Sequence, residues 1–134
     1  RSNMELLGQS ETTFPVSEIV TAITESAEYL KLNEIDVMFS HFAGGKVAAD
    51  AAILTYEFFE AIAEIIFEGA KKMSVILTNK EDALTLRIIV NLAGLPFSES
   101  WKREEVQACS GTINIMQDDE DTIIALSFEK GGAV

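Results

Sequence analysis

The chain has 134 residues, which is enough for one domain, because domains usually contain roughly 100–150 residues. Hydrophobic residues make up 48% of the sequence, so the chain can bury a core and is not disordered as a whole. Its formal net charge is −12, from 22 acidic and 10 basic residues. This charge argues against a nucleic-acid partner and against direct contact with an anionic membrane, since both need clustered lysine and arginine.

Few residues suited to cross-links or zinc are present. The single cysteine, Cys109, excludes an internal disulfide, and with the single histidine, His41, it cannot assemble a zinc site of the Cys/His type. The most apolar stretch, 47–67, contains four acidic residues, whereas a membrane-spanning helix needs about 20 largely uncharged residues. No signal peptide is visible in this sequence.

The first part of the chain predicts a lead-in, a helix and a strand. Residues 1–13 are polar, and the opening Arg-Ser-Asn resembles a tag remnant, so we expect a fragment of a longer protein. Ser17 is the predicted N-cap of a helix over 17–30, where apolar residues recur at intervals of three and four. Alternation over 35–39 predicts a strand, which Ala-Gly-Gly at 43–45 ends.

The second part begins with the central helix. Residues 47–68 contain no glycine or proline and are apolar nearly all round, which predicts a mostly buried helix that ends at Gly69. The elements expected after it are two strands (73–78 and 83–90) joined by a turn at 79–82, a helix (100–109) that stops at Gly111, and two strands (112–116 and 122–128) separated by an acidic turn.

This order of elements predicts one domain over residues 14–132. Strands that follow one another as hairpins, with helices between them, form a mixed, mostly antiparallel sheet. The helices then cover one face of that sheet. The predicted fold class is therefore α/β, a two-layer sandwich.

Several segments resemble the ATP-binding domain of sensor histidine kinases, which belongs to the GHKL group of ATPases. Residues 56–64 (YEFFEAIAE) and 69–77 (GAKKMSVIL) resemble the family's helix with its Glu-x-x-x-Asn box and the strand after it. Residues 84–94 (LTLRIIVNLAG) resemble the strand that leads into the family's Asp-x-Gly-x-Gly turn. Residues 106–116 and 122–132 resemble the closing helix and hairpin. The resemblance implies the histidine-kinase ATPase fold and a role in bacterial two-component signalling.

The resemblance also indicates which residues stand at the catalytic and metal positions. In the family, the box Asn helps to hold the magnesium that bridges the nucleotide phosphates, and the Glu one turn earlier positions the attacking water. Glu60 stands at the position of that Glu, and Glu64 stands where the Asn would be. If the register shifts back by one residue, Ala63 takes the Asn position and coordinates nothing.

The nucleotide turn departs from the family pattern. Its Asp and glycines, which recognise adenine and let the backbone approach the nucleotide, are replaced by Asn91, Ala93 and Leu95, with Gly94 between the last two. Asn91 can accept one hydrogen bond, as a neutral and weaker partner than a carboxylate. No second glycine-rich segment follows to form a lid over phosphates. Asn91, Ala93 and Gly94 are therefore expected to form a vestigial nucleotide pocket.

The central helix carries an acidic stripe that opposes ATP binding. Glu57, Glu60, Glu64 and Glu68 are spaced by three and four residues and share one helix face. A triphosphate facing them would meet several like charges, with no lysine or arginine in the nearby motif. A bound magnesium could offset the repulsion, and the alternative interpretation of the stripe is a solvated helix face.

Other candidate residues have structural interpretations. We expect His41 to lie in a loop, Cys109 to pack as a small apolar residue, and Trp101 to anchor the core or its edge.

The resulting hypothesis is an ATPase-like domain of a sensor histidine kinase-like protein with a non-functional ATP site. It would be catalytically inactive, a pseudokinase, and would act through contacts with a protein partner or the parent's own dimerisation domain. One alternative is an active kinase domain that binds ATP with magnesium through Glu64, and another is a stand-alone binding module. We expect a monomer or weak homodimer, on the cytoplasmic side if the parent is membrane-anchored.

Overall fold

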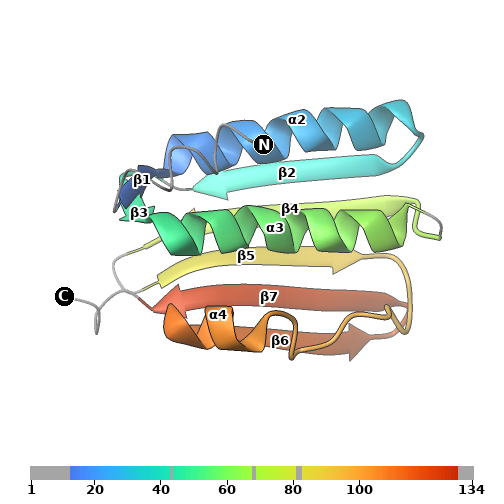
Figure 1. Cartoon of the computed structure of the whole chain (residues 1–134). Helices are drawn as coiled ribbons and strands as arrows, with labels where there is room; N and C mark the ends of the chain where they lie inside the picture. Colours follow the sequence, from blue (N-terminus) through green and yellow to red (C-terminus); the bar gives the residue numbers. More distant parts are fainter. Residues whose placement is uncertain (1–12, 43, 68, 81–82, 130–134) are drawn as a thin grey trace.

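The computed structural model describes residues 13–42, 44–67, 69–80 and 83–129 as a sheet with helices packed on it (Figure 1). In chain order its elements are β1 (Thr13–Pro15), α2 (Val16–Leu32), β2 (Asp36–Phe42), β3 (Lys46–Ala48), α3 (Ala49–Ile66), β4 (Lys72–Asn79), β5 (Ala83–Val90), α4 (Arg103–Ala108), β6 (Gly111–Asp118) and β7 (Asp121–Glu129).

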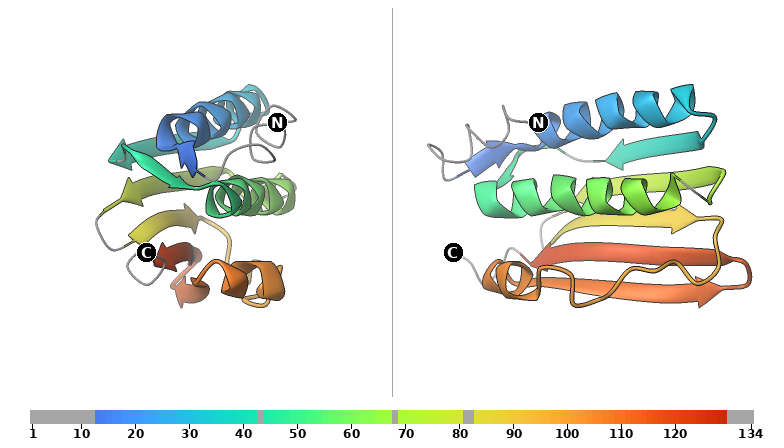
Figure 2. Two further views of the ribbon diagram at one scale, coloured as in Figure 1. Left: turned by 60° about the vertical axis from the view of Figure 1, so that its left-hand side comes forward. Right: turned by 45° about the vertical axis from the view of Figure 1, so that its right-hand side comes forward.

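The main sheet has five strands in the order β2-β4-β5-β7-β6. β2 and β4 are parallel, because α3 crosses the sheet between them, and the other neighbours are antiparallel. Helices α2, α3 and α4 all lie on one face, and none of the described elements covers the other face (Figure 2). This arrangement confirms the predicted two-layer sandwich with a mixed, mostly antiparallel sheet.

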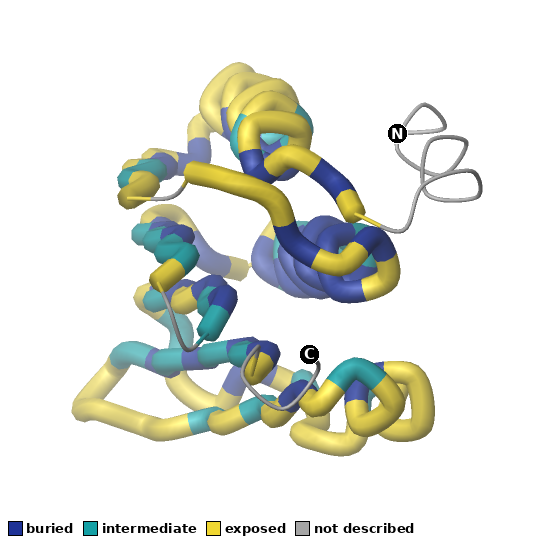
Figure 3. The backbone as a smooth tube through the Cα atoms, turned by 90° about the vertical axis from the view of Figure 1, so that its left-hand side faces the viewer, coloured by how far each residue is buried: buried dark blue, intermediate teal, exposed yellow. Residues whose placement is uncertain are grey.

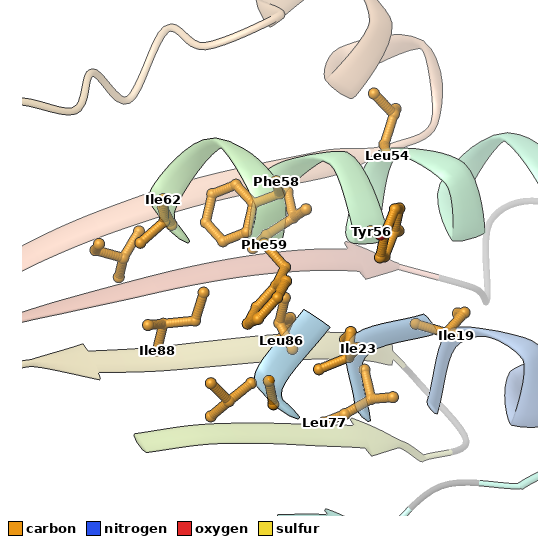
Figure 4. Close-up of a cluster of buried hydrophobic side chains, with 14 of the residues drawn as sticks. Ile19, Ile23, Leu54, Tyr56, Phe58, Phe59, Ile62, Leu77, Leu86 and Ile88 are labelled. Carbon is orange, nitrogen blue, oxygen red and sulfur yellow. The ribbon is translucent and has the colours of Figure 1, made fainter. Parts of the chain in front are cut away.

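The core lies between α3 and the sheet. Figure 3 shows α3 as the most buried helix, whereas α2 exposes its outer side. Figure 4 shows Phe58, Phe59 and Ile62 of α3 packed over Leu86 and Ile88 of the sheet. All five side chains are fully buried, which explains why α3 is apolar nearly all round.

A small second sheet, β1 paired with β3, was not predicted. Phe14 lies opposite Val47, so α3 begins at Ala49 and not at residue 47 as predicted. The predicted N-cap at Ser17 is wrong, because α2 begins at Val16 and its N-cap is Pro15. The backbone N–H of Val16 instead donates to the Gly45 carbonyl at 2.9 Å.

Other predicted boundaries shift by a few residues. β2 extends to Phe42 and includes His41, which was expected in a loop. α4 is shorter than predicted and begins at Arg103, because Lys102 before it has a left-handed backbone with φ of 45°. Residues 1–12 of the predicted lead-in, Glu68 of the acidic stripe and residues 81–82 of the predicted turn lie outside the described residues.

Within the described ranges, no helix is both long enough and apolar enough to cross a membrane.

Candidate functional site

Asn91 lies directly after β5 and joins the ends of two strands. Its side-chain oxygen Oδ1 accepts hydrogen bonds from the backbone N–H groups of Lys71 at 3.1 Å and Lys72 at 2.9 Å. Its own backbone N–H donates to the Lys72 carbonyl at 3.2 Å. The amide oxygen that would correspond to the family's adenine acceptor is therefore engaged in holding β5 to the start of β4.

The backbone after Asn91 is fixed from the β6–β7 side. The Gly94 N–H donates to Oε1 of Gln117 at 3.0 Å, and Gly94 has a φ of +68°. The hydroxyl of Thr122, which is 1% exposed, donates to the Leu92 carbonyl at 2.6 Å. Ala93 is exposed and Leu95 is buried. These contacts anchor the start of the β5–α4 segment, defined here as residues 91–102.

The rest of the β5–α4 segment packs on α3 through aromatic rings. The Phe58 ring lies 5.5 Å from that of Phe97 and 5.6 Å from that of Trp101, measured between ring centroids, and both pairs meet edge to face. Phe97 and Trp101 also contact each other, at 6.0 Å. Aromatic pairs of this geometry stabilise a contact beyond the area they bury.

An ion pair also joins the β5–α4 segment to α3. Nζ of Lys102 lies 2.8 Å from Oε1 of Glu57, and 5.5 Å from the centroid of the Trp101 ring. The sequence motif around the acidic stripe contains no lysine or arginine, but the fold brings Lys102 to Glu57. The sequence alone did not indicate this pair, because the two residues are 45 positions apart.

Glu60 and Glu64 lie toward α2. Oε2 of Glu60 accepts a hydrogen bond from the Tyr56 hydroxyl at 2.7 Å, and that hydroxyl lies 3.1 Å from Oγ of Ser26 on α2. Both glutamates line a groove between α2 and α3. The described contacts therefore place Glu60 and Glu64 with α2, whereas the contacts of Asn91 and Gly94 are with the strands.

Glu57 and Phe58 of α3 both contact the β5–α4 segment. Both residues lie on the predicted central helix, but nothing in the sequence connects either of them with residues 97–102. An aromatic side chain on each of the two elements was the available signal, but only the fold shows that they meet. Across the described residues, no three His, Cys, Asp or Glu side chains are gathered closely enough to hold a metal ion.

Cys109 is a half-buried thiol beyond the end of α4. Burial raises the pKa of the Cys109 thiol, and the nearby Asp50 carboxylate raises this pKa further. Both effects favour the neutral thiol, which is the unreactive form. Cys109 packs against the core as expected.

The fold has clear counterparts among solved structures. The catalytic domain of histidine kinase ThkA is similar over 89% of this chain and 95% of its own, with a TM-score of 0.65 and 14% sequence identity. The Acinetobacter baumannii histidine kinase AdeS gives a TM-score of 0.64 at 9% identity, over 89% of this chain and 66% of that chain. The histidine kinase domain of a blue-light activated kinase from Erythrobacter litoralis gives 0.62 at 13% identity, over 88% and 68%.

No family model and no curated protein sequence matches the chain. The structural matches show that the chain has the fold of histidine-kinase catalytic domains, as the resemblance implied. At these identities the match extends to the fold alone, and a shared fold does not fix function.

Proposed function

We propose that this chain is the ATPase-like domain of a sensor histidine kinase-like protein in two-component signalling, and that it acts through protein contacts without binding ATP productively. The partner is another protein or the parent's own dimerisation domain, on the cytoplasmic side. The observation that carries the proposal is the packing of the β5–α4 segment on α3.

This packing leaves the nucleotide-binding elements of the fold in contact with each other. In the resembled family, the box helix and the glycine-containing turn after the strand flank the nucleotide. Here Phe97 and Trp101 from the segment after β5 contact Phe58 of that helix. Leu95, which replaces a glycine, is only 7% exposed and adds its side chain to the core. A nucleotide at this flank would have to displace buried apolar and aromatic groups.

The charges of α3 add a second obstacle. The Lys102 ammonium, which lies beside this flank, is paired with Glu57 at 2.8 Å. Glu60 and Glu64 supply two further carboxylates on the same helix. A polyphosphate approaching α3 would therefore meet several carboxylates on one helix, and repulsion between like charges disfavours its binding.

The alternative function is an active kinase domain that binds ATP through magnesium. Glu64 favours this alternative, because its carboxylate is exposed and oxygen ligands suit magnesium. Asn91 would then exchange one of its backbone hydrogen bonds for the adenine amino group. Both functions predict the same fold, so only nucleotide binding separates them.

Isothermal titration calorimetry with ATP and magnesium tests the proposal. We expect no saturable heat up to millimolar nucleotide, with ADP and with magnesium alone as parallel titrations. Saturable binding at micromolar ATP would contradict the proposal. In that case Glu60→Gln and Glu64→Gln, measured separately, would show whether either carboxylate supports the metal.

A further inference from the structure

The groove between α2 and α3, called here the α2–α3 groove, is a second feature of the helical layer. It has a volume of about 460 Å³, within the range of roughly 300–1,000 Å³ typical of ligand sites. α2 runs beside α3 on the side of α3 away from the β5–α4 segment, and the groove lies between these two helices (Figure 1). It is therefore separate from the contact on which the proposed function rests.

Aromatic rings form one end of the α2–α3 groove. The rings of Tyr29 on α2 and Phe67 at the end of α3 are stacked, with centroids 6.0 Å apart and planes 8° from parallel. They are 61% and 43% exposed, respectively, and together they form a contiguous exposed aromatic surface. Their faces can therefore receive another flat or cationic group.

The rest of the lining is acidic. Glu25 from α2 and Glu60 and Glu64 from α3 line the groove, and the described residues of its lining include no lysine, arginine or histidine. Glu25 and Glu64 form no ion pair with any described residue. The groove therefore combines three carboxylates with exposed aromatic faces.

We propose that the α2–α3 groove binds an arginine-bearing peptide segment of a partner protein. A guanidinium group donates pairs of hydrogen bonds to carboxylates and stacks on aromatic rings, so it matches both features of the lining. The buried Leu30 and Tyr56 at the base add apolar surface for the residues beside the arginine.

A peptide fits the groove better than a metal ion does. The carboxylates of the described residues do not gather closely enough to hold a metal ion. The groove runs between two helices, which is a common site for a helical segment with its anchors on one face. The inference extends the proposed function by naming the place and chemistry of a protein contact.

Calorimetry with a synthetic peptide of about 12 residues, with arginine and leucine on one helical face, provides the direct test. The matched peptide carries citrulline at each arginine position, because citrulline keeps the shape of arginine without its charge. At about 150 mM salt we expect saturable binding of the arginine peptide, and at least about tenfold weaker binding of the citrulline peptide.

Two double variants separate the groove from the overall negative charge of the chain. Glu25→Gln with Glu64→Gln should weaken binding of the arginine peptide by about tenfold. Glu104→Gln with Glu105→Gln removes the same amount of charge from exposed positions on α4. This control should change the binding of the arginine peptide by less than about twofold. Equal weakening by both double variants would overturn the proposal, as would a flat titration of the native domain.

Amide chemical-shift mapping locates the peptide independently. The largest shifts should fall on α2 and on the part of α3 from Tyr56 to Phe67, and Tyr29→Ala should weaken binding while leaving the domain folded. Shifts confined to other elements would overturn the assignment of the groove. The ATP titration and the peptide titration have separate outcomes, so either proposal can fail while the other stands.

Discussion

Gly111 is a residue whose role in the structure is steric. A Cβ atom at this position would lie 2.6 Å and 2.8 Å from two ring carbons of Phe128, and 2.8 Å from Cγ1 of Val106. Both neighbours are buried, at 2% and 3% exposure, so neither can move aside freely. The sequence indicated Gly111 only as the stop of a helix.

We expect Gly111→Ala to lower the free energy of unfolding by about 1–3 kcal/mol, because overpacking displaces Phe128 or Val106. Gly44→Ala is the matched control, because no heavy atom lies within 4 Å of the added Cβ and its backbone needs no left-handed conformation. Urea denaturation of both variants measures the difference. Equal stability of the two variants would show that Phe128 and Val106 repack around the added Cβ without loss of stability.

At the scale of elements, the β5–α4 segment depends on a buried hydroxyl. Thr122 of β7 donates to the Leu92 carbonyl and also lies 3.2 Å from Oε1 of Gln117, which in turn accepts from Gly94. Thr122→Val keeps the side-chain shape but leaves a carbonyl without its donor.

We expect Thr122→Val to cost about 1–2 kcal/mol of stability and to speed amide hydrogen exchange at residues 92–95. Thr112→Val, at an exposed position on β6, is the control and should leave both quantities near the native values. Unchanged exchange in Thr122→Val would mean that the aromatic contacts alone hold the segment.

The elements also show which parts of the fold can be predicted from periodicity in the sequence. The central helix and the strands of the two hairpins were predicted because each is long enough to show its repeat. β1 and β3 were missed, because three residues each cannot display an alternation. The site was predicted less well: Glu60 and Glu64 are on the expected helix, but the sequence did not show that they face α2.

That difference has a physical cause. Spacing along a helix tells which residues share a face, but not which neighbour that face meets. The order β2-β4-β5-β7-β6 decides that α2 lies on one flank of α3 and the β5–α4 segment on the other. Such contacts join residues far apart in the chain, as Lys102 and Glu57 do.

The protein as a whole has an excess of acidic side chains, with a formal net charge of −12. The two ion pairs among the described residues involve exposed or partly exposed side chains, and such pairs contribute little to stability. Repulsion between the remaining carboxylates then disfavours the compact state, and salt screens this repulsion.

We therefore expect the melting temperature to rise as sodium chloride increases from about 10 mM to about 200 mM, where the screening length falls to less than about 10 Å. Differential scanning calorimetry measures this dependence. The Glu104→Gln, Glu105→Gln double variant should show a smaller rise, because it carries less charge. A melting temperature that falls with salt would show that attractive pairs dominate.

The two flanks of α3 also differ in their chromophores. The only tryptophan in the chain, Trp101, packs on Phe58 at one flank, whereas both tyrosines, Tyr29 and Tyr56, line the groove at the other. Emission excited at the red edge, where tyrosine does not absorb, therefore reports on the β5–α4 segment alone. The native protein thus carries an optical probe of the β5–α4 segment that needs no introduced label.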